Sequence, residues 1–262
     1  FEVLLHRMVW SFLLLICIVA TTGRRSELRG VLTDLRRFRI LVFTALLVSS
    51  NWFVFIWAIH TDRILHTSLG YYINPLVNVL LAMIFLKERL RRAQALAVVL
   101  AAVGVLLLTL EIGRLPWISL YLAVSFGFYG LIRKTAPVNA IVGLTVETLL
   151  QSVPAGAYLL YLHARGLGAF GHAGLPTAAL LVCAALVTAV PLVLFTAGAR
   201  QIRFTTVGLL QYIAPSCTFL LAVFVYREPF TGTQLMTFVL IWAALGIYTF
   251  DMVRSHRRTR RQ

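Results

Sequence analysis

The chain has 262 residues, of which 60% are hydrophobic and 13% charged, and its mean hydropathy is +0.88. A soluble domain carries about a quarter of its residues as charged side chains, so this composition excludes an ordinary soluble enzyme or binding domain. The net charge of +15 suits a nucleic-acid partner or a membrane protein, and the placement of the charges decides between them.

Nine stretches are nearly free of charge, and each has about the 20 residues that a helix needs to cross a bilayer. None combines the basic flank, short apolar segment and small-residue cleavage site of a signal peptide, so all nine are expected in the folded protein. The sequence therefore predicts an all-α polytopic membrane protein with nine transmembrane helices, at 3–22, 39–59, 66–86, 93–110, 115–132, 139–162, 177–199, 205–226 and 232–252.

The basic residues concentrate in alternate loops of this arrangement. If the loop at 24–39 is cytoplasmic, nineteen of the 24 Lys and Arg fall on the cytoplasmic side and five on the outer side. This is the positive-inside rule, and it requires no nucleic-acid partner. We predict a multi-pass protein of the bacterial inner (plasma) membrane, with its basic tail, 254–262, in the cytoplasm.

The second predicted helix, 39–59, contains the pair Asn51-Trp52 near its middle and Trp57 near its outer end. Tryptophan at a membrane boundary belongs to the aromatic belt, which accounts for Trp57. Asn51 and Trp52 lie deeper, where an amide needs a hydrogen-bonding partner. We interpret these two residues as part of a substrate pathway, with belt and packing roles as the alternative.

The third predicted helix, 66–86, places Tyr71, Asn74 and Asn78 on one face, at i, i+3 and i+7. Amides exposed to hydrocarbon would lose hydrogen bonds, so Asn74 and Asn78 must face protein or water. Pro75 frees a backbone carbonyl, which a cavity could satisfy. The residues alone leave two alternatives open: a substrate-lining face, or hydrogen bonding between helices with a proline kink.

Small residues recur at intervals of four in the next two predicted helices. Such faces let helices pack closely, either within one chain or between two copies, so a homodimer is a candidate assembly. The two sets are Ala93, Ala97 and Ala101, and Ser119, Ala123 and Gly127.

The sequence resembles itself when it is shifted by 140 residues. Tyr72-Ile-Asn-Pro75 falls on Tyr212-Ile-Ala-Pro215, and Tyr71 on Gln211. Glu88 falls on Glu228. The two copies thus share their prolines, which we expect to kink the helices, and their glutamates, which we expect at the corners that follow them. The second half has five helices and the first has four, so we expect a further helix before residue 1. Five is odd, so the halves would have opposite orientations, as in many secondary transporters. We assign 1–112 and 113–253 to the two halves.

Glu147 lies a few residues inside the sixth predicted helix, and its partner in the repeat is Arg7. An intramembrane carboxylate is a candidate carrier of a coupling proton, and an ion pair or a snorkelling side chain is the alternative.

Cys17, Cys183 and Cys217 lie in apolar stretches without metal-ligand spacing, so we expect buried thiols and neither a metal site nor a cofactor.

Several long segments resemble the RarD-type transporters, a branch of the EamA-like drug/metabolite transporter superfamily. The resemblance extends over residues 1–253 and implies ten helices in two inverted halves. It also implies that five of the helices present line the pathway, at 39–59, 66–86, 115–132, 177–199 and 205–226. The segments are HRMVWS (6–11), NWFVFIWAI (51–59), SLGYYINPLVNVLLAMIFLKERL (68–90), LPWISLYLAVSFGFYGLIRK (115–134), GLTVETLL (143–150) and LLQYIAPSCTFLLAVFVYREPF (209–230).

The leading hypothesis is a secondary transporter that moves a small metabolite or drug by alternating access. No phosphate-binding GxxxxGK[ST] loop is present. A lipid-translocating or structural membrane subunit is the alternative. An intramembrane lipid-modifying enzyme would require a catalytic set that the sequence lacks, so we predict that the protein is not an enzyme. The predicted substrate-pathway residues are Asn51, Trp52, Tyr71, Tyr72, Asn74, Asn78, Gln211 and Tyr212.

Overall fold

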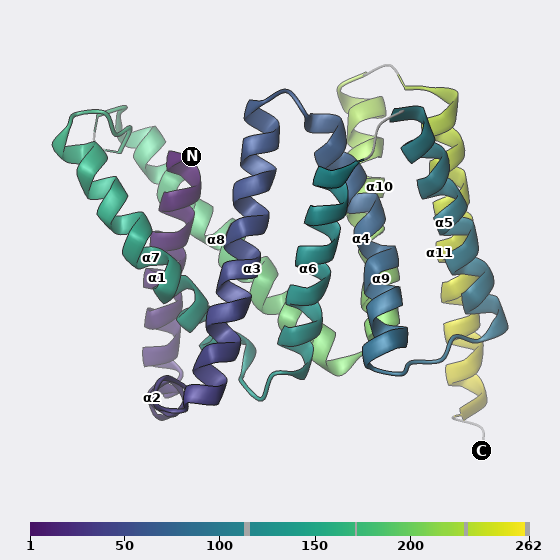
Figure 1. The fold of residues 1–262 in the computed structure, drawn as a ribbon, viewed down its shortest axis with the longest axis horizontal. Helices are drawn as coiled ribbons and strands as arrows, with labels where there is room; N and C mark the ends of the chain where they lie inside the picture. The colour runs from purple at the N-terminus through teal and green to yellow at the C-terminus, as the bar shows by residue number, and fades with distance from the viewer. Residues whose placement is uncertain (113–115, 171, 228–229, 260–262) are drawn as a thin grey trace. The chain divides into compact units, whose positions relative to one another are not determined.

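A computed structural model describes residues 1–112, 116–170, 172–227 and 230–259, and within them it contains helices and no strand (Figure 1). Three short segments, α9, α10 and the π-helical η1, follow one another as one span. The helices are α1 (Glu2–Thr21), α2 (Arg25–Thr33), α3 (Leu35–His60), α4 (Ile64–Phe85), α5 (Arg92–Ile112), α6 (Trp117–Thr135), α7 (Ala140–Ala164), α8 (Leu175–Gln201), α9 (Phe204–Leu210), α10 (Ile213–Leu220), η1 (Leu221–Val225) and α11 (Gly232–Thr259).

Eight helical segments within the described residues are long and apolar enough to cross a membrane. The remaining predicted segment, 115–132, corresponds to α6, which has 19 residues and carries Arg133 and Lys134 in its last turn. The prediction of an all-α polytopic membrane protein is therefore confirmed. One helix, α2, was not predicted. It occupies part of the segment 24–39, which the sequence assigned to a loop.

The register of 140 residues is present in the helix boundaries. Three pairs of segments start at equivalent positions, which are Leu35 and Leu175, Ile64 and Phe204, and Arg92 and Gly232. The corners that follow α4 and η1 also correspond, because Lys87 and Arg227 both have a left-handed backbone, with φ of 53° and 54°. Local structure therefore repeats together with the sequence.

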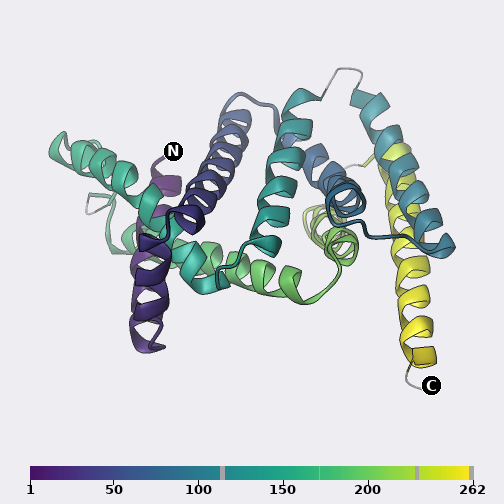
Figure 2. The same ribbon diagram turned by 60° about the horizontal axis from the view of Figure 1, so that its bottom comes forward.

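The described residues form two compact units, and each unit combines helices from both halves of the repeat. Unit 1 comprises residues 1–56 and 132–201, and unit 2 comprises 57–131 and 202–262. In unit 1, α1 lies beside α7, and in unit 2, α5 lies beside α11, as both ribbon views show (Figures 1 and 2). In these two pairs a helix packs more extensively on its repeat partner than on its neighbours in sequence. The division into halves at 112/113 stays a prediction about the duplication.

The paired helices of unit 2 are antiparallel. Arg91 forms an ion pair with Asp251 at 3.6 Å, whereas Thr237 donates to the carbonyl of Gly104 at 3.0 Å, so residue numbers rise along α5 as they fall along α11. Gly104 allows this approach, because a methyl group there would lie 3.2 Å from the carbonyl oxygen of Thr237. In a bilayer, where apolar burial gives little driving force, such close backbone contacts hold helices together.

Candidate functional site

Three amide side chains, of which the two asparagines are buried, meet between α4 and the junction of α9 and α10, and we call Asn74, Asn78 and Gln211 the amide cluster. The Nδ2 of Asn78 donates to Oδ1 of Asn74 at 2.8 Å and also to Oε1 of Gln211. Asn78 is 0% exposed and Asn74 8%. The two asparagines lie near the middle of the span His66–Phe85. The structure thus brings together three predicted pathway residues from the two halves of the repeat.

The chain is broken where Gln211 enters the cluster. Residues 211 and 212 form a turn between α9 and α10. Pro215 has no N–H to donate to the carbonyl of Gln211, which accepts instead from Ala214 at 3.3 Å. Pro75 occupies the equivalent position in α4, which continues as one helix through it. The shared proline therefore breaks only one of the two repeat partners.

Two glycines bring neighbouring helices against Asn78. A methyl group on Gly208 of α9 would lie 2.8 Å from the Pro75 carbonyl oxygen and 3.1 Å from Cβ of Asn78. A methyl group on Gly127 of α6 would lie 2.9 Å from Cγ1 of Val77 and 3.2 Å from Oδ1 of Asn78. The predicted small-residue face of α6 therefore packs on α4 within this chain.

The tyrosines of the predicted pathway have different surroundings. Tyr212 is 0% exposed and donates its hydroxyl to the carbonyl of its repeat partner, Tyr72, at 3.1 Å. Tyr72 lies edge-on to the ring of Phe238 at 5.6 Å. Tyr71, in contrast, is 54% exposed, so it does not join Asn74 and Asn78 in the buried part of the helix face as the spacing predicted. Two of the three tyrosines, Tyr72 and Tyr212, thus form the contact between the repeat partners.

Asn51 and Trp52 belong to unit 1, where Asn51 is buried. The guanidinium carbon of Arg7 lies 5.3 Å from the centroid of the Trp52 ring. Nε of Arg7 also donates to Oγ1 of Thr188 in α8 at 2.7 Å. The Trp52 ring is therefore paired with a cation inside a predicted span, a contact that the sequence did not indicate.

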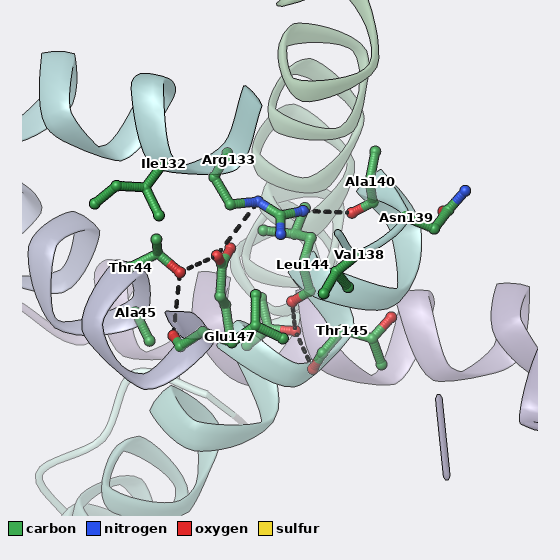
Figure 3. A network of polar contacts seen from close by, with 12 residues as sticks. Thr44, Ala45, Ile132, Arg133, Val138, Asn139, Ala140, Leu144, Thr145 and Glu147 are labelled. Carbon is green, nitrogen blue, oxygen red and sulfur yellow. Dashed lines mark hydrogen bonds and ion pairs between the residues drawn. The ribbon is translucent and has the colours of Figure 1, made fainter. Parts of the chain in front are cut away.

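A second polar cluster, formed by Thr44, Arg133 and Glu147, lies inside unit 1 and is called the ion-pair cluster (Figure 3). Nε of Arg133 lies 3.4 Å from Oε1 of Glu147, and both side chains are 0% exposed. The Thr44 hydroxyl donates to the same oxygen at 2.5 Å, and Nη2 of Arg133 donates to the carbonyl of Ala140 at 3.1 Å. The cluster joins α3, the last turn of α6 and α7.

The predicted helix 115–132 placed Arg133 in the loop that follows, and this was wrong, because the residue lies in the last turn of α6. The residue is 0% exposed because α6 continues to Thr135 and its last turn is enclosed in unit 1. Gly143 provides the space, since a methyl group there would overlap the guanidinium of Arg133. Glu147 is buried in an ion pair, one of the two predicted alternatives, and it does not snorkel to the surface.

Glu88 connects the end of α4 to the start of α9. Its carboxylate accepts from the backbone N–H groups of Phe204 at 2.7 Å and Thr205 at 3.1 Å, and from the Thr205 hydroxyl at 2.8 Å. Arg203 lies 3.5 Å away. Burial alone would raise the pKa of Glu88, but these hydrogen bonds and the Arg203 charge outweigh it and hold the pKa below its ordinary value of 4.5. Its repeat partner, Glu228, lies outside the described residues.

The three cysteines are exposed, contrary to the expectation of buried thiols. They lie on apolar helices, whose outer surfaces are covered by hydrocarbon in a membrane. No group of three or more His, Cys, Asp or Glu side chains is placed to hold a metal ion in the part of the chain that the structure describes.

Comparison with known proteins shows similarity to membrane transporters. The model of the EamA-like transporter family matches residues 1–110. An uncharacterized transporter of Vibrio cholerae is 46% identical over 99% of this chain and 86% of its own length. The RarD protein of Escherichia coli is 42% identical over 98% of this chain and 87% of its own.

Two further matches extend the comparison. The chloramphenicol-sensitive protein RarD of Pseudomonas aeruginosa is 32% identical over all of this chain and 88% of its own length. One crystal structure of a protein matches 97% of this chain and 88% of its own, with a TM-score of 0.69 and 19% identity. That likeness shows a shared fold.

Proposed function

Because the chain belongs to the EamA-like transporter family, on its RarD-type branch, we propose that it is a secondary transporter that moves a small metabolite or drug across the membrane by alternating access. The observation that carries the proposal is the amide cluster. The buried amides of Asn74 and Asn78 cost free energy in hydrocarbon unless they have partners, and they meet the amide of Gln211 beside a helix broken near the middle of its span. Broken helices at this depth form the substrate sites of many transporters.

The amide cluster offers uncharged hydrogen-bonding groups in apolar surroundings, as expected for a site that binds a small amphipathic molecule. The name of the Pseudomonas relative suggests chloramphenicol as the first compound to examine. A gradient would supply the driving force. The ion-pair cluster supports an anchoring role for Glu147 better than proton coupling, because a proton on Glu147 would leave the buried Arg133 charge without a counter-ion.

The proposal is tested in two steps with purified protein. A thermal-shift screen against amphenicols, amino acids, nucleotides and quaternary amines identifies a ligand, and proteoliposomes then measure its transport. We expect Asn74→Ala to abolish transport without loss of folding, and Tyr212→Phe, which removes only the hydroxyl bonded to Tyr72, to reduce it.

Thr109→Ala is the control for these variants. The Thr109 hydroxyl bonds only to the carbonyl of Val105 in its own helix, so we expect normal transport. Normal transport by Asn74→Ala and Tyr212→Phe would show that the pathway lies elsewhere. A lipid-translocating subunit, the alternative, would scramble labelled phospholipid in the same vesicles and would not transport the ligand.

A further inference from the structure

The carbonyl oxygen of Asn78 has no partner among the described residues although it is fully buried. Both N–H groups of its amide are used, one toward Asn74 and the other toward Gln211. Oδ1 accepts no hydrogen bond in the described part of the chain. A buried acceptor without a donor destabilises the fold in which it lies, so its presence at the centre of a membrane span requires an explanation.

The surface that covers this oxygen belongs to α6. Gly127 lies over it, and the neighbouring contacts along α4 involve other small residues. Ser119 donates its hydroxyl to the carbonyl of His66 at 2.6 Å, and Ala123 packs against Leu69. Gly127 has no side chain that could donate to Oδ1, so α6 excludes water from the acceptor without satisfying it.

We propose that Oδ1 of Asn78 is the hydrogen-bond acceptor for the transported molecule, and that α6 covers it in this conformation and separates from α4 to admit that molecule. The inference rests on the proposed function. A contact through glycine and alanine can open without breaking an ion pair, and opening exposes the one atom of the Asn78 amide that has capacity left.

The chemistry of the free atom defines the class of ligand. An acceptor binds an N–H or O–H group, so the bound molecule carries a primary, secondary or tertiary ammonium, a hydroxyl or an amide N–H. A quaternary ammonium has no such donor and should not bind through this atom. The alternative is a permanent helix contact in which a Cα–H of Gly127 faces Oδ1.

Accessibility of position 78 tests the opening. In the full chain with Cys17, Cys183 and Cys217 changed to Ser, Asn78→Cys is treated in membrane vesicles with 2-aminoethyl methanethiosulfonate. We expect labelling at least about tenfold faster than that of Ala101→Cys, which is 0% exposed in the contact between α5 and α11. Equal rates, or no labelling at position 78, would overturn the proposal.

A disulfide provides a second test that does not alter Asn78. A Cβ added at Gly127 would lie 2.9 Å from Cγ1 of Val77. The double variant Val77→Cys, Gly127→Cys therefore brings two thiols within reach of a disulfide bond. The probes are 2-phenylethylamine and its N,N,N-trimethyl derivative, which lacks a donor. We expect only the primary amine to raise the Tm of the reduced protein, by about 2 °C or more at saturation, and oxidation to abolish the effect.

The outcomes separate the two proposals. Equal shifts by both probes, no shift by either, or a shift that survives oxidation would overturn the assignment of Oδ1 as the acceptor beneath α6. Transport that still depends on Asn74 would then leave the proposed function standing. Labelling and probe binding as expected, together with normal transport by Asn74→Ala, would overturn the proposed pathway instead.

Discussion

Arg133 and Glu147 are charged groups in a place without water, so each depends on the other for its stability. Desolvation of a charge in a protein interior costs several kcal/mol, and the attraction of the pair offsets this cost only while both partners are present. The hydroxyl of Thr44 and the carbonyl of Ala140 add hydrogen bonds to the pair. The cluster therefore fixes the last turn of α6 to α7 and α3.

The first prediction follows from this mutual dependence. Arg133→Met and Glu147→Leu should each lower the free energy of unfolding by about 3–5 kcal/mol, because each leaves one charge buried alone. The double variant should be more stable than either single variant. Thermal unfolding of the four proteins in one detergent measures the coupling. Additive losses would mean that the two side chains do not depend on each other.

Gly143 has a separate, steric part in the same cluster. Gly143→Ala should lower the free energy of unfolding by about 1–3 kcal/mol, because the added methyl group overlaps the Arg133 guanidinium. Gly156 lies in the same helix, and a methyl group added there would have Cγ2 of Val9, at 4.0 Å, as its nearest neighbour. Gly156→Ala should raise the free energy of unfolding by up to about 1 kcal/mol, since alanine favours the helix. Similar unfolding temperatures for the two variants would contradict this account.

The residue scale also shows where sequence reasoning succeeds. Asn74 and Asn78 could be predicted as buried, because an amide in an apolar helix has few alternatives to a protein partner. Arg133 could not, because a basic residue near the end of a span usually belongs to a loop. The available signal was Gly143, and a glycine shows its purpose only when the side chain that occupies its space is known.

At the scale of elements, the two repeat partners differ although they share a proline. Pro75 lies within a continuous α4, whereas the chain turns at Gln211 and Tyr212 before Pro215. Most helix boundaries could be predicted within a few residues, because charged clusters end the apolar stretches, but α11 continues to Thr259 through the basic segment predicted as a tail. The helix break and α2 could not, because a turn inside an apolar span and a short basic helix leave no mark in hydropathy.

Glu88 provides a prediction about pH at this scale, because it fixes α4 to α9. Its pKa in the folded protein is below the ordinary value of 4.5, so the unfolded chain takes up a proton first as the pH falls. The stabilisation is therefore present above pH 4.5 and is lost as the pH falls below that value toward the folded pKa. Between about pH 5.5 and pH 3.5, the Tm of the wild-type protein should fall by more than the Tm of Glu88→Gln. These two pH values lie about one unit on either side of the ordinary pKa.

The control for this measurement is Glu27→Gln, since Glu27 forms a surface pair with Arg24 in which both side chains are more than a third exposed. A pair of that kind contributes little, so this variant should follow the wild-type curve. Equal pH dependence of Glu88→Gln and wild type would mean that the capping of α9 does not stabilise the fold.

At the scale of the whole molecule, the repeat explains why sequence neighbours separate. Each compact unit unites helices from both halves, and α4 meets the α9–α10 segment through Tyr72 and Tyr212, which are repeat partners themselves. The 140-residue register could be predicted from the sequence because the Tyr–Pro–Glu frame survives in both copies. The pairing across the halves could not, because hydropathy does not indicate which apolar face meets which.

The opposite orientation that the sequence predicts for the two halves leads to the last prediction. The corner after α4 carries Glu88, and its partner in the 140-residue register is Glu228, so the two positions should lie on opposite sides of the membrane. The native cysteines are exposed, so each test cysteine requires a background with Ser at positions 17, 183 and 217. In right-side-out vesicles, an impermeant maleimide should label Glu228→Cys and leave Glu88→Cys unlabelled, and inverted vesicles should give the reverse. Thr61→Cys, in the loop before α4 that the charge distribution assigns to the outer side, should behave like position 228. Labelling of positions 88 and 228 from the same side would exclude the inverted repeat, because an even number of spans would then separate the two corners.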